Sequence, residues 1–338
     1  MSKAEAAAAI LLIGATLYAV FGGADFGAGL WQLLSGRATD PDRVRSRIEH
    51  SIAPVWEANH VWLIFILVVL WTGFPEAFSA VMTTLYIPLA LAALGIVLRG
   101  SGFAFGKVIR GRAKARADLV FAISSVLTPF FMGTVVGAIA SGQVPAAGNG
   151  DPTASWTGTL PLLIGALFVT SGAYLAAVFL VHDSRGAGEE GSARHFARCA
   201  LGAAIVAGAL ALAGVFALRA DARFVFDGLT GPGLPLVVLS GACGLVALVL
   251  LGREVTRRGG ARGGRLLRPA AVGAVVAVIV GWGVAQHPDL LPGELSIDAA
   301  AAPDPTLTGL LIIFAAALVV VIPALALLYS LSQRRLLE

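Results

Sequence analysis

The chain opens on the apolar stretch AAAAILLIGATLYAVFGGADFGAGLWQLL, residues 6–34, in which Asp25 is the only charged side chain. A helix of ~20 apolar residues crosses the hydrocarbon core of a bilayer. The stretch is too long for the apolar region of a signal peptide, and Lys3 is the only basic residue before it, so no cleavable signal is expected. It predicts the first span of an integral membrane protein.

Eight further apolar blocks follow, and together they predict one polytopic membrane domain over residues 1–338. The chain is 57% hydrophobic and 13% charged, against about 25% charged residues in soluble domains. The blocks are continuously apolar rather than alternating, which excludes a β-barrel. We expect an all-α fold of about nine transmembrane helices, as two four-helix bundles plus one extra helix. The predicted spans are 7–34, 51–73, 77–98, 117–141, 158–182, 197–219, 233–251, 268–286 and 305–330.

Positive charge is confined to alternate loops. Of 24 Lys and Arg residues, 21 lie in the segments 35–50, 99–116, 183–198, 252–268 and 331–338. Short cytoplasmic loops are rich in Lys and Arg, so the N-terminus is expected outside and the C-terminus in the cytoplasm. The pI of about 9.4 thus reflects topology rather than nucleic-acid binding, although the loop 252–268 could also contact anionic lipid.

Residues that bind haem or metal are sparse. Cys199 and Cys243 lie inside apolar blocks and in no CxxC or CxxCH arrangement, which argues against a disulfide framework, an iron–sulfur cluster and covalent haem. Of the five histidines, His60 alone lies well inside a predicted span, whereas haem needs axial ligands such as His, Met or Cys. We expect no metal site, and no haem held by this chain alone.

Asp25 lies among small residues, in GGADFGAG at 22–29. Gly22, Asp25 and Gly29 share one helix face, and Gly23 and Gly27 form a small-xxx-small pair beside it. Acidic side chains at membrane depth face a bundle interior, a partner or water. Asp25 is therefore expected to point into a tight helix contact.

A second polar cluster lies in APVWEANHVW, residues 53–62. Pro54 lacks a backbone donor and disturbs the preceding turn, which could free a carbonyl for a polar network. The cluster itself consists of three polar side chains flanked by two tryptophans, namely Glu57, Asn59, His60, Trp56 and Trp62.

The two acids are expected at one depth. Asp25 lies five residues beyond the middle of the inward-running first span, and Glu57 lies five residues before the middle of the outward-running second span. Both positions are about 7 Å toward the cytoplasm. Two carboxylates at one level predict a proton relay or a cation site; protonated carboxyls hydrogen-bonded between helices are the structural alternative. Arg99, at the inner end of the third span, is expected to pair with a carboxylate or to snorkel.

Three motifs carry a family resemblance: GADFGAG at 23–29, PVWEANHVWLI at 54–64 and LRGSGFAF at 98–105. In this order and at these span ends, they resemble subunit II of cytochrome bd-type quinol oxidases. The detailed match extends to about residue 106, and beyond it only length, nine-span topology and polarity agree.

The resemblance implies a heterodimer in the bacterial plasma membrane with a haem-bearing subunit I. That partner would hold heme b and heme d, oxidise quinol and reduce dioxygen to water with cytoplasmic protons, so this chain would be an oxidase subunit that is not catalytic alone. Glu57 would belong to the proton path, with Asp25, His60 and Asn59 beside it. The tryptophans Trp62 and Trp56 would border oxygen entry. The resemblance leaves room for a bound quinone and a small single-span accessory subunit.

The sequence departs from the family pattern at a few positions, and two other classes of function remain as alternatives. Some members have Asp-Gly where this chain has Glu57-Ala58, and Gln in place of His60, but Glu keeps the carboxylate. The alternative from another class is a proton-coupled secondary transporter with Asp25 and Glu57 as its coupling-ion site, because transporters use broken helices. A purely structural membrane subunit, whose two carboxylates tolerate amide replacement, is the third hypothesis.

Overall fold

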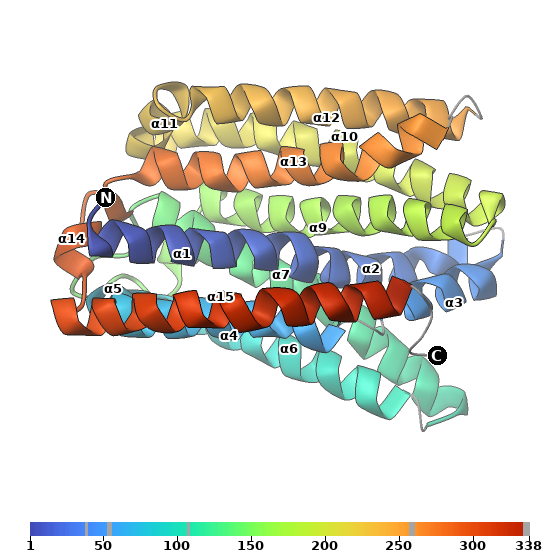
Figure 1. The fold of residues 1–338 in the computed structure, drawn as a ribbon, viewed down its shortest axis with the longest axis horizontal. Coiled ribbons are helices and arrows are strands. Elements are labelled where there is room, and N and C mark those ends of the chain that lie inside the picture. Colours follow the sequence, from blue (N-terminus) through green and yellow to red (C-terminus); the bar gives the residue numbers. More distant parts are fainter. Residues whose placement is uncertain (38–39, 53–55, 107–108, 257–260, 334–338) are drawn as a thin grey trace.

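The computed structural model describes residues 1–37, 40–52, 56–106, 109–256 and 261–333. Long helices lie alongside one another in a single bundle (Figure 1). The first predicted span is confirmed as α1 (Lys3–Leu17), the π-helical turn η1 (Tyr18–Gly22) and α2 (Gly23–Leu34), which together form one stretch of 32 residues. Its N-terminus is fixed by a capping box, in which Ser2 and Glu5 each accept the backbone N–H of the other.

The remaining elements follow in chain order. The long helices are α4 (Trp56–Gly73), α6 (Tyr86–Gly106), α7 (Gly111–Ala140), α9 (Thr159–Gly186), α10 (Glu190–Asp221), α12 (Leu234–Val255), α13 (Ala261–Gln286) and α15 (Asp304–Gln333). The short elements are η2 (Ser35–Arg37), α3 (Pro41–Ile52), α5 (Pro75–Thr84), α8 (Ala154–Thr157), α11 (Arg223–Thr230), the antiparallel pair β1 (Asp289–Leu291) and β2 (Leu295–Ser296), and α14 (Ile297–Ala300).

Seven helices of the described chain are long and apolar enough to cross a membrane. The number is eight if α4 and α5, which are bent by 118° relative to each other, form one span; the apolar part of α6, Tyr86–Gly102, is shorter. The chain is therefore an all-helical, multi-pass membrane protein. The count of nine spans, the division into two four-helix bundles and the side of each terminus stay predictions.

The predicted span 77–98 is not one straight helix. It divides at Leu85, whose backbone (φ −107°, ψ 26°) lies outside the helical region. Pro88 explains the break, because proline has no N–H to give to the carbonyl of Thr84 and its ring would clash with that carbonyl in a continuous helix. In the first turn of α6 the missing donor is tolerated.

Helix α9 is the centre of the bundle and packs against α2, α7 and α10. Its middle section is buried and rich in alanine, with Ala173, Ala176 and Ala177 at most 3% exposed. Small side chains allow helix axes to approach closely, which is the usual basis of packing between membrane helices. This close packing positions α2, and with it Asp25, in the protein interior.

Basic connections gather at one end of the bundle, the right-hand end in Figure 1, where α3 and the turn between α9 and α10 lie. Arg47 of α3 forms an ion pair of 2.6 Å with Glu189 in that turn. Arg185, at the end of α9, pairs with Glu254 of α12. Three of the predicted basic segments are thus joined at the same end, as their alternation along the chain requires.

Candidate functional site

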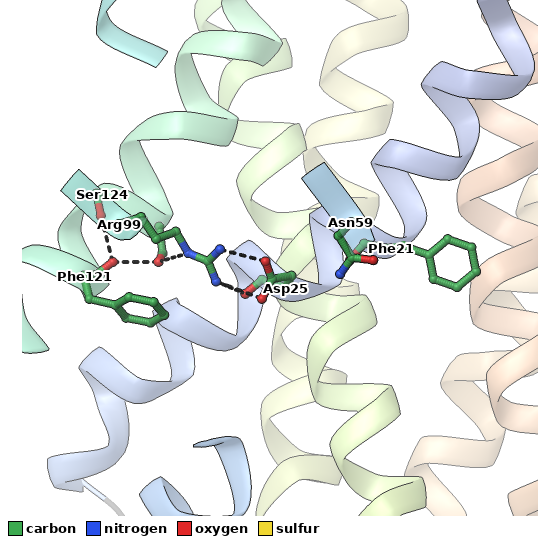
Figure 2. Close-up of polar contacts among 7 residues, drawn as sticks. Phe21, Asp25, Asn59, Arg99, Phe121 and Ser124 are labelled. Carbon is green, nitrogen blue, oxygen red and sulfur yellow. Dashed lines mark hydrogen bonds and ion pairs between the residues drawn. The ribbon is translucent and has the colours of Figure 1, made fainter. Parts of the chain in front are cut away.

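A buried ion pair between Asp25 and Arg99 is the centre of the candidate site (Figure 2). Arg99 Nη1 donates to one carboxylate oxygen of Asp25 at 2.7 Å, and Nη2 donates to the other at 2.9 Å. Nη2 also reaches the Asp25 backbone carbonyl at 3.0 Å. Arg99 is completely buried and Asp25 is 5% exposed. Of the two alternatives expected for Arg99, pairing with a carboxylate is the one observed, and it links α6 to α2.

Helix α7 completes the surroundings of Arg99. The guanidinium Nε donates to Ser125 Oγ at 2.9 Å, and Ser125 in turn donates to the carbonyl of Phe121 at 2.6 Å. The guanidinium carbon lies 4.7 Å from the ring centres of Phe26 and Phe121, a cation–π distance. Arg99 is thus held by hydrogen bonds at its edge and by aromatic rings at its faces.

The pair forms a neutral unit inside the membrane protein. A buried charge is stable only when it is paired and hydrogen-bonded. Arginine is always protonated, and its planar fork matches both carboxylate oxygens. Arg99 thus occupies both carboxylate oxygens of Asp25, and the pair joins α2 to α6. The expected role of Asp25 in a proton relay stays a prediction.

Glycines let α2 approach its neighbours closely enough to bury Asp25. A Cβ on Gly27 would overlap the carbonyl of Gly172 in α9, and a Cβ on Gly29 would overlap the side chain of Ser125 in α7. Beyond them, Trp31 Nε1 donates to the carbonyl of Ala173 at 2.8 Å. The tight helix contact expected around Asp25 is confirmed, and its partners are α9 and α7.

The second polar cluster lies beside the first span. Asn59, which is 4% exposed, donates from Nδ2 to the carbonyl of Phe21 at 3.3 Å (Figure 2). The His60 ring meets Phe26 edge-on, with ring centres 6.1 Å apart. These contacts bring the N-terminal part of α4 alongside the Asp25 stretch.

Glu57 and Trp56 belong to the backbone of α4, but their side chains lie outside the described residues. Trp62 is half-buried and packs edge-on against Phe65, which contacts Phe314 of α15. Phe65 thus links α4, which contains Trp62, to α15. The proposed roles of Glu57, Trp56 and Trp62 stay predictions.

Sequence reasoning missed three residues of the site. Ser125 and Phe121 come from the apolar helix α7. The available signal was a group of small polar residues, Ser124, Ser125 and Thr128, whose spacing of three and four residues places them on neighbouring positions of the helix surface. Gly172 of α9 had no signal beyond being a glycine, because its importance depends on which helix faces it.

Comparison with known proteins identifies the family. The family model for cytochrome bd terminal oxidase subunit II matches residues 4–332. The chain belongs to this family. The match covers nearly the whole chain, so it includes the parts beyond residue 106 where the resemblance of the motifs ended.

Curated members of the cytochrome bd family support the assignment over shorter stretches. The cytochrome bd ubiquinol oxidase subunit 2 of Bacillus subtilis is 31% identical over 114 residues, 33% of this chain and 33% of the relative. The cytochrome bd-I ubiquinol oxidase subunit 2 of Escherichia coli K12 is 31% identical over 134 residues, 39% of this chain and 34% of the relative. The alignments thus span about a third of each relative's length.

The fold of bd oxidase extends over the full chain. The structure of the bd oxidase from Geobacillus thermodenitrificans matches with a TM-score of 0.78 and 24% identity, and the match covers 98% of both chains. At this identity the likeness concerns the fold. Among the residues that the structure describes, no group of three His, Cys, Asp or Glu side chains could hold a metal ion.

Proposed function

We propose that the chain is the non-haem-ligating subunit II of a cytochrome bd-type quinol oxidase in the bacterial plasma membrane. It pairs with a haem-bearing subunit I, which oxidises quinol and reduces dioxygen to water. The chain contributes scaffold, proton delivery from the cytoplasmic side and oxygen access. Family membership supports the oxidase role, and the buried Asp25–Arg99 pair beside α4 is the observation that carries the mechanism.

The ion pair separates the tasks of the two carboxylates. Arg99 occupies both oxygens of Asp25, so Asp25 joins α2 to α6. Glu57 is left as the group that gains and loses a proton. Asn59 and His60, which contact the first span near Asp25, provide polar neighbours along its route. Protons enter at the basic end of the bundle, where the cytoplasm is proposed to lie.

The transporter alternative is disfavoured by the same geometry. A coupling-ion site needs carboxylate oxygens that are free to bind a cation or a proton. Those of Asp25 already accept from a completely buried guanidinium. An added cation would be repelled by Arg99, because like charges at this distance in a medium of low polarity interact strongly.

The experiment that tests the proposal is Glu57→Gln, made in the complex formed with the product of the neighbouring oxidase gene. Turnover and proton uptake should fall by at least about tenfold, as for loss of a proton-transferring group, while the haem absorption spectrum is unchanged. Unchanged turnover would remove Glu57 from the mechanism. Absence of any b or d haem in the purified complex would refute the oxidase function itself.

A further inference from the structure

Tyr18 begins the π-helical turn η1, seven residues before Asp25. A π-turn widens a helix, and such turns are frequent at functional positions. At 1.5 Å per residue, Tyr18 lies about 10 Å from Asp25 along the span. Within the predicted span 7–34, Tyr18 is closer to the middle than Asp25 is.

The phenol ring of Tyr18 lies on Gly22. A Cβ at Gly22 would be 2.8 Å from two ring carbons and 3.5 Å from Cζ, the carbon that bears the hydroxyl. Gly22 lies between Tyr18 and Asp25 in the span, so the ring reaches toward the ion pair and shortens the separation.

The hydroxyl of Tyr18 is buried and has no hydrogen-bond partner within the described chain. Tyr18 as a whole is 8% exposed. Buried hydroxyls are nearly always satisfied by protein or by an ordered water, and internal waters occupy sites with several polar groups. The same π-turn also carries a polar contact, because Asn59 of α4 donates to the carbonyl of Phe21.

We propose that the Tyr18 hydroxyl binds a buried water molecule and extends the proton path from the level of Asp25 toward the middle of the membrane. The neutral phenol gives its proton to a second water molecule on one side while its oxygen takes a proton from the bound water on the other side. One O–H bond breaks as another forms on the same oxygen, so no charge accumulates on Tyr18. This inference rests on the proposed function, because it requires protons to cross this chain.

The test is Tyr18→Phe in the assembled two-subunit oxidase. This change removes one hydroxyl and keeps the ring that fills the space over Gly22. Quinol-driven turnover and proton uptake by oxidase-containing vesicles should fall by about an order of magnitude, with unchanged haem content and a larger solvent deuterium isotope effect. The matched control is Tyr86→Phe, because Tyr86 is 55% exposed and lies in α6, outside the site; it should keep full turnover.

Two outcomes would overturn the inference. Full turnover of Tyr18→Phe, with a raised unfolding midpoint, would show that the hydroxyl is an unsatisfied group without a ligand. Loss of haem in Tyr18→Phe would assign the hydroxyl to assembly instead. Glu57→Gln, measured alongside, separates this inference from the proposed function. If only Glu57→Gln is slow, Tyr18 alone is excluded; if both variants keep full rate, proton delivery through this chain fails as a whole.

Discussion

Replacing Arg99 by methionine should destabilise the protein more than any other single change to its charged residues. The change keeps most of the apolar stem but removes four hydrogen bonds, three to Asp25 and one to Ser125. It leaves the Asp25 side chain, which is 2% exposed, without a counter-charge. Breaking a buried pair in this way costs about 3–5 kcal/mol. Protonating a carboxyl of ordinary pKa at pH 7 costs about 4 kcal/mol, which gives the same magnitude by another route.

The double variant Asp25→Asn with Arg99→Met contains no unpaired charge. Its loss should be about 1–2 kcal/mol, the size expected when a buried pair is replaced by neutral groups that fit imperfectly. The two single changes should therefore add up to at least about 2 kcal/mol more than the double change. A coupling of this size is diagnostic of direct contact.

The assay is the midpoint of heat-induced unfolding of the purified complex in detergent, followed by gel filtration of the surviving fraction. A loss of 3–5 kcal/mol corresponds to a midpoint lower by about 10 °C. Arg219→Met, at an exposed arginine at the end of α10, is the control and should change the midpoint little. A midpoint of Arg99→Met equal to that of the unchanged protein, or strictly additive single and double variants, would refute the reasoning.

Three further predictions address packing, surface charge and gas access. Gly27→Ala should lower the free energy of unfolding by about 1–3 kcal/mol in the same assay, because its Cβ would overlap the α9 backbone. The control Gly202→Ala, whose Cβ would have nothing within 4 Å, should be neutral or stabilising. Equal effects of the two changes would contradict the packing argument. The hydrogen bond and charge of Arg47 hold the pKa of Glu189 below its ordinary value of 4.5. The ion pair therefore stabilises the fold above about pH 4.5, and this contribution is lost as the pH falls through the lowered pKa. At a partly exposed site the contribution is about 0.5 kcal/mol. Unfolding midpoints of Glu189→Gln and the unchanged protein should thus differ at pH 7 and converge at low pH; a pH-independent difference would exclude the ion pair. Trp62→Ala should change the apparent oxygen affinity measured with an oxygen electrode, and an unchanged affinity would assign Trp62 to packing alone.

The location of the site could be predicted from the sequence, whereas its pairing could not. Asp25 stands out because an acid in an apolar block is costly, and the glycines around it indicate a close helix contact. The sequence left two predictions open for Arg99, because a position at a span end suits both snorkelling and pairing with a carboxylate. Only the rotation of α6 about its axis decides between them, and no residue near Arg99 reports that rotation.

Local distortions of the helices were equally hidden, for different reasons. Pro88 could have indicated the break at Leu85, but proline is tolerated within membrane helices often enough that the apolar block was read as continuous. The π-turn Tyr18–Gly22 has no compositional signal, because it depends on one inserted residue within an ordinary apolar run. Gly172 matters only because Gly23 and Gly27 face it, a relation between helices that are far apart in the sequence.

The Asp25–Arg99 pair also bears on how the chain is inserted into the bilayer during synthesis. Taken singly, each charged segment enters lipid poorly, since one Asp or Arg near a helix centre costs about 2.5–3.5 kcal/mol in translocon-mediated insertion. Asp25 leaves the ribosome first, and the apolar part of α6, which contains Arg99, is shorter than the other spans. We expect the first span to pair with α6 during insertion, so that the two opposite charges enter the membrane together. The order of synthesis would then give the short apolar part of α6 a partner that is already in place.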